Sequence, residues 1–108
     1  MTDEKFNLIV NVVVAHLNIP KKDIFLPNKR RPLVDARHLV YYTCYHFGIR
    51  NTYIKEYFWR KNLQVPHASI IHGVNKMKIQ RRNDQELRNV QDKIIDLCTK
   101  QMNYGSKH

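Results

Sequence analysis

Apolar residues recur three and four positions apart through most of this 108-residue sequence, and no stretch alternates apolar with polar residues as a half-buried strand does. The first run shows this spacing along one helix face: Phe6, Ile9, Val10, Val13 and Leu17. The spacing predicts an all-α fold of about six helices. A chain of this length forms one domain with a modest core, which we expect to extend over residues 1–108.

Proline and glycine mark where these helices begin and end. Pro20 ends the first helix, and a short helical turn is expected over residues 21–26. Pro32 suits the first turn of a long helix, and Gly48 suits the C-cap of the same helix. After a shorter helix, Pro66 begins another one at a position that proline favours.

Side-chain burial in the later helices can also be predicted. The helix after the last proline places four apolar residues on one side: Ile70, Ile71, Val74 and Met77. Trp59 is interpreted as a core or turn anchor, with stacking on a sugar or base left open. His38 is expected at the surface or half-buried. Residues 84–102 form a last amphipathic helix, opened by Asp84 or the residue before it.

The net charge of +10 lies entirely in the middle of the chain. Residues 1–28 contain three basic and three acidic residues, and residues 83–108 contain four of each. Residues 29–82 contain twelve basic residues against only Asp35 and Glu56. A surplus on one contiguous segment indicates a binding surface for a polyanion, so nucleic acid is the first expectation. An acidic protein partner or a merely solvated basic surface is the alternative.

Several classes of protein do not fit the sequence. Acidic residues at positions 3 and 4 argue against a signal peptide, and the longest apolar run is too short to span a bilayer. Cys44 and Cys98 lie far apart in apolar helical patterns, which favours two core thiols in a reducing cytoplasm, with a disulfide between them as the alternative. We therefore expect a cytoplasmic, nucleoid-associated protein without a membrane span.

The sequence also gives no sign of catalysis, a metal or a cofactor. His67 and His72 are five positions apart, which is not the spacing of a zinc-binding helix, and no cysteine or carboxylate cluster accompanies them. The basic segment has no carboxylate pair, and neither cysteine has a neighbour that would activate it. A binding protein is expected rather than an enzyme.

Residues 51–78 have the outline of a helix-turn-helix, in which two short helices are joined by a turn. The second helix presents polar and basic side chains on its outer side: His67, Ser69, His72, Asn75 and Lys76. Ala68, Ser69 and Gly73 are small residues that let this helix approach base edges closely. The N-terminus of the helix favours a phosphate.

The run VPHASIIHGVNKM resembles the signature RDH(S/T)TVIHAxxKI of domain IV, the C-terminal DNA-binding domain of the bacterial replication initiator DnaA. The upstream stretch LIVNVVVAHLNIPKKDIFLPNKRRPLVDARHLVYY resembles the first helix, basic loop and long helix of that domain. The resemblance runs from about Lys5 to Lys100. It implies a fold of the DnaA domain IV or Trp-repressor type, with a helix-turn-helix in the major groove of double-stranded DNA.

Carried over by position, the resemblance makes His67 a base-contacting residue and Ser69 a phosphate-contacting one, while His72 and Lys76 match the next two signature positions. An ungapped alignment puts the minor-groove contact on Lys29, and a small shift puts it on Arg30 or Arg31. The complete set of expected DNA-binding residues is Lys29, Arg30, Arg31, Arg37, Arg60, Lys61, His67, Ala68, Ser69, His72 and Lys76.

The departures from the signature bear on the target site. Val65 and Pro66 replace an Arg-Asp pair and Ala68 replaces a hydroxyl residue, so the usual DNA target of the family is not expected. The turn is also longer by about four residues and adds Arg60 and Lys61 as candidate phosphate contacts.

Three functions follow from these features. The first is a sequence-preferring regulator of replication or transcription, with a replication or transcription protein as a candidate second partner. The second is an interaction module that uses the same surface to bind an acidic protein. The third is non-specific DNA binding, in which the basic loop matters and His67 does not. The sequence contains no GxxxxGK[ST] phosphate loop, so a DNA-binding module without an ATPase is expected.

Overall fold

A computed structural model describes residues 2–106, which form five α-helices, one 3-10 helix and no strand. In chain order the elements are α1 (Thr2–Leu17), η1 (Lys21–Phe25), α2 (Arg31–His46), α3 (Asn51–Arg60), α4 (His67–Asn83) and α5 (Gln85–Ser106). The all-α prediction and the short turn before α2 are confirmed for these residues. Residues 1, 107 and 108 of the expected domain lie outside the described part.

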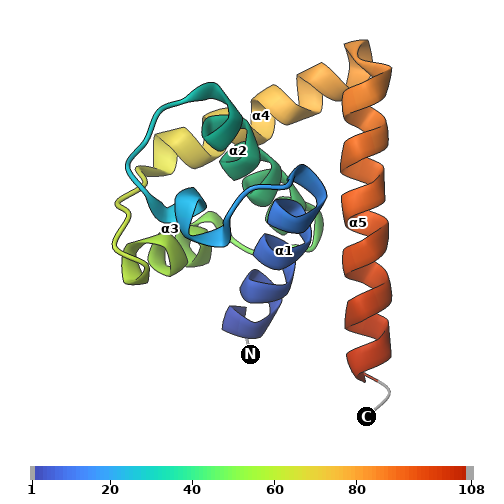
Figure 1. The fold of residues 1–108 in the computed structure, drawn as a ribbon, viewed down its shortest axis with the longest axis horizontal. Helices are drawn as coiled ribbons and strands as arrows, with labels where there is room; N and C mark the ends of the chain where they lie inside the picture. Colours follow the sequence, from blue (N-terminus) through green and yellow to red (C-terminus); the bar gives the residue numbers. More distant parts are fainter. Residues whose placement is uncertain (1, 107–108) are drawn as a thin grey trace.

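Helix α2 lies at the centre of the molecule and contacts every other helix (Figure 1). Its residues from Ala36 to Cys44 are all buried, including Tyr41, Tyr42 and Arg37. Helical spacing of apolar residues marks only one face of a helix, but α2 is buried on more than one face because the other helices surround it. His38 is one consequence: it is 7% exposed, not half-buried or at the surface.

Local sequence chemistry explains most helix ends. Gly48 has φ +77°, a left-handed conformation that suits a glycine after the end of α2. Asn18 takes the same region, φ 57°, so α1 ends at Leu17 rather than at Pro20. The Asp84 carboxylate accepts a hydrogen bond from the backbone N–H of Leu87 (3.1 Å), which caps α5 as predicted.

Two predictions about side-chain burial are wrong. Trp59 is 63% exposed and does not anchor the core, and Ile71 is 48% exposed. Gly73 faces α2 rather than solvent, since a Cβ there would lie 2.6 Å from Cδ2 of His38. This glycine allows α2 and α4 to approach each other closely. It is not one of the small residues on the outer side of α4, where the sequence predicted it.

The two cysteines are completely buried and unpaired, as expected of core thiols. Burial raises the pKa of Cys98 to about 11 and raises that of Cys44 further. Among the described helices, none has the length and apolar character that crossing a membrane requires.

Candidate nucleic-acid interface

The basic loop, residues 26–31, leads from η1 into α2 (Figure 1). Lys29 and Arg30 of the loop are exposed, as is Arg31, which is also the first residue of α2. The side-chain oxygen of Asn28 accepts a hydrogen bond from the backbone N–H of Arg30 (2.8 Å), which fixes the turn. Arg31 lies 3.7 Å from Asp35 in an exposed pair one helical turn away, so its charge is only weakly compensated.

Arg37 has a different role from the DNA contact expected of it. Its side chain is 9% exposed, and its guanidinium donates to the backbone carbonyls of Ile24 (2.8 Å), Asn28 (2.9 Å) and Leu26. Those three carbonyls belong to η1 and the basic loop. Arg37 therefore holds the loop against α2, and the exposed cations of the loop are presented from an ordered backbone.

A groove of about 440 Å³ lies beside this loop. Lys29 of the loop and Ser69 in the first turn of α4 both line it, although they are forty positions apart in the sequence. Residues 63–66, which lead into α4, form another part of its wall, and Arg37 and His38 of α2 also line it. The fold thus brings the basic loop and the start of the predicted recognition helix together.

The segment that leads into α4 is anchored by its apolar residues. Leu63 and Val65 are 8% and 6% exposed, so Val65 is a core residue at the place where the resemblance has an arginine. Pro66 is the N-cap residue of α4, and no side chain caps this end. His67, Ala68 and Ser69 are exposed in the first turn, where uncapped N–H groups favour an anion.

The outward side of α4 is a stripe of exposed residues at helical spacing: Ala68, His72, Asn75 and Ile79. The opposite side is buried through Ile70, Val74 and Met77. Asn75 lies on the outer side as its spacing predicts, although the resemblance gives it no role. An amide at this place can both donate and accept hydrogen bonds, which is the chemistry that reads an adenine edge.

His38 lies beneath this helix and next to the groove. Its ring centroid is 5.9 Å from that of His72, and its buried Nδ1 has no hydrogen-bond partner. Burial lowers the pKa of His38, and the nearby charges of Lys76 and His72 lower it further. This shift favours the neutral form of the His38 imidazole, and Lys76 is partly exposed beside it.

The two cations of the longer turn are not brought to α4 by direct contacts. Arg60 forms an ion pair with Asp3 at the start of α1. The amino group of Lys61 lies 5.7 Å from the ring centroid of Tyr57 and 5.9 Å from that of Phe25. Both side chains are thus directed towards α1 and η1. The spacing of residues in the sequence does not predict these contacts.

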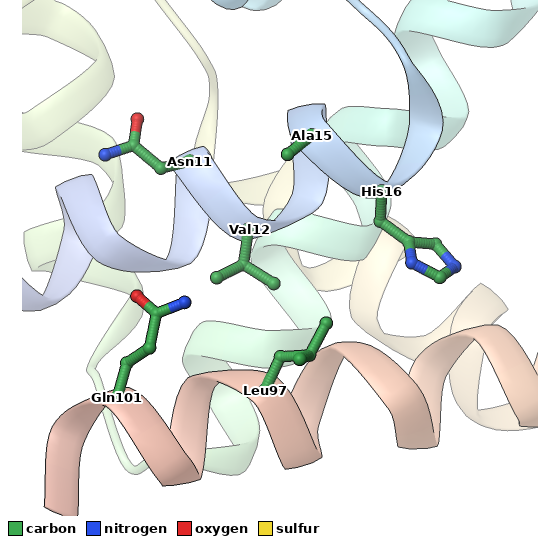
Figure 2. A pocket seen from close by; sticks show the side chains of 6 residues that line it. All are labelled: Asn11, Val12, Ala15, His16, Leu97 and Gln101. Carbon is green, nitrogen blue, oxygen red and sulfur yellow. The ribbon is translucent and has the colours of Figure 1, made fainter. Parts of the chain in front are cut away.

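A groove between α1 and α5 has different chemistry (Figure 2). Its volume is about 330 Å³, and Val12, Ala15 and Leu97 give it a mostly apolar lining beside His16 and two amide side chains. Its described lining contains neither lysine nor arginine. Within the described residues, no group of three or more potential metal ligands occurs either.

Comparison with protein-family models, curated proteins and solved structures gives no match to this chain. Its function must therefore be inferred from the geometry and charge of this surface.

Proposed function

We propose that this protein binds double-stranded DNA, with α3 and α4 acting as a helix-turn-helix and α4 lying in the major groove. The observation that carries the proposal is the groove that Lys29 and Ser69 share. It joins the basic loop to the start of α4 within the segment that holds the whole net charge of +10. Such a surface suits the phosphates of one duplex strand beside an inserted helix.

The residues of α4 divide into two roles in this proposal. His67 and Ser69, with the uncapped helix end, contact phosphates and the first base edges. His72 and Asn75, which follow Ala68 along the outward stripe, read bases deeper in the groove. The small side chain of Ala68 lets the helix approach the base pairs.

We further propose that the protein is a DnaA domain IV-like regulator of replication or transcription. The order of basic loop, long helix and VPHASIIHGVNKM supports this kinship. Its target differs from the usual family site, because Val65 is buried and Ala68 has no hydroxyl group.

The experiment is selection from a random duplex library at physiological salt, followed by anisotropy titration of the selected and scrambled duplexes. We expect the selected duplex to bind at least ~10³-fold more tightly than the scrambled one. His72→Ala should reduce that ratio, whereas His16→Ala, an exposed histidine on α1, should leave it unchanged. Equal binding of both duplexes would contradict sequence reading and leave a non-specific binder.

The second candidate is an interaction module for an acidic protein. Three exposed apolar side chains favour it, since Trp59, Ile71 and Ile79 are 63%, 48% and 56% exposed on α3 and α4. Failure of any duplex to bind, at low salt as well as at physiological salt, would select this candidate over DNA.

A further inference from the structure

Trp59 is the only tryptophan of the chain, and 63% of it is exposed at the C-terminal end of α3. An exposed tryptophan is unusual in a monomer and typical of a contact surface. It lines a groove of about 490 Å³ together with Lys55, one helical turn earlier on α3, and residues 64–66. Among the residues that the structure describes, no acidic one lines this groove.

This second groove adjoins the proposed DNA surface. Gln64, Val65 and Pro66 line it, and the same three residues line the groove beside the basic loop. The two grooves therefore meet at the segment that leads into α4. One contains Lys29 and the other contains Lys55, so each offers a cation next to the start of the helix.

A helix that enters the major groove has a phosphate backbone on each side. The basic loop lines the groove on one side of the start of α4, so in the proposed arrangement it meets the backbone on that side. Lys55 has the charge that a second backbone requires, and the flat indole of Trp59 can pack on a deoxyribose or base.

We infer that Lys55 and Trp59 contact the DNA strand across the major groove from the strand that the basic loop contacts. This inference rests on the proposed function and extends it to a second site. In this arrangement Lys55 makes the phosphate contact that the sequence suggested for Arg60 and Lys61. Those two residues are held by Asp3 and by the rings of Phe25 and Tyr57.

The single tryptophan allows a direct test. We expect the selected duplex to quench Trp59 emission and to reduce its quenching by acrylamide severalfold. Trp59→Ala should weaken duplex binding about tenfold, as loss of a stacking contact does, while Trp59→Phe should recover most of the affinity. Both substitutions lie at an exposed position, so the fold should tolerate them.

Lys55 on α3 and Lys61, the residue directly after α3, provide the matched pair. Lys55→Gln should weaken binding and make the log–log salt slope shallower by about 1, whereas Lys61→Gln should change neither. If the duplex binds while Trp59 stays equally accessible and Lys55→Gln behaves like the parent, the inference is wrong and the proposed function stands. If no duplex binds at any salt concentration, both are wrong. Protection of Trp59 by poly-glutamate but not by duplex would identify the surface as a site for an acidic protein.

Discussion

At the scale of single residues, Arg37 has the clearest structural role. Its guanidinium donates to three backbone carbonyls of η1 and the basic loop. Arg37→Ala leaves these carbonyls without their donor and should lower the free energy of unfolding by about 3 kcal/mol, taking about 1 kcal/mol for each hydrogen bond. Arg37→Lys should recover only part of this, because an ammonium lacks the planar fork. Urea denaturation measures both.

The matched control for Arg37 is Lys29, which is exposed on the same loop. Lys29→Ala should change the free energy of unfolding by less than about 0.5 kcal/mol while weakening DNA binding. A fully stable Arg37→Ala variant would contradict the role of Arg37 in holding the loop.

His38 gives the stability of the protein a pH dependence. Its pKa in the folded state is lowered, first by burial and then by Lys76 and His72, so the unfolded chain binds a proton more readily. Stability should therefore fall as the pH decreases through about 6.5, the ordinary histidine pKa, and level off below the folded-state value. Urea midpoints between pH 5 and 8 measure this. His38→Gln should flatten the curve, and His16→Gln should not.

At the scale of elements, the sequence predicted the parts of the fold that depend on neighbouring residues. Gly48, Pro66 and Asp84 end or begin helices through their own backbone and side-chain chemistry, and all three positions were predicted correctly within about one residue. Burial of His38 and exposure of Trp59 depend on segments far away in the chain, so local periodicity could not give them.

The candidate site likewise has parts that the sequence predicted and parts that depend on how distant segments pack. The exposed loop cations and the outer residues of α4 were predictable from charge and helical spacing. The groove that joins Lys29 to Ser69 was not, because it depends on how the loop, α2 and α4 pack. Lys55 was missed for a similar reason: one exposed lysine on a short helix has no pattern to distinguish it until the adjacent turn is placed.

The packing of α2 against α4 is tested at Gly73. A Cβ there would lie 2.6 Å from Cδ2 of His38 and 2.9 Å from Cδ2 of Tyr41, two buried rings with little room to move. Helix propensity favours alanine by about 1 kcal/mol, and overpacking costs about 1–3 kcal/mol. Gly73→Ala should therefore lower the melting temperature by a few degrees. Ser69→Ala, at an exposed position of the same helix, should not. A more stable Gly73→Ala variant would show that the two helices can separate at little cost.

At the scale of the whole molecule, the neutral segments and the basic segment of the sequence form different helices. The two neutral segments contain α1 and α5, which pack against each other (Figure 1). The segment with the net charge of +10 forms the basic loop, α2, α3 and α4. Within it, Arg81 is bound to Tyr42, Gln91 and Asp92 and is not free for a phosphate. We take five cations as the candidate phosphate contacts: Lys29, Arg30 and Arg31 of the basic loop, Lys55 of α3, and Lys76 in the middle of α4.

Five neutralised phosphates predict a log–log salt slope of about −4.5, because each contact to duplex DNA contributes about −0.9. The binding constant should then fall roughly 500-fold between 50 and 200 mM salt. Anisotropy titrations at four or more salt concentrations measure the slope. Lys29→Gln should make it shallower by about 1, whereas Lys100→Gln, on α5 and paired with Asp96, should leave it unchanged. A slope near −1 would mean that the loop and α4 do not contact the duplex together, since one cation alone would account for it.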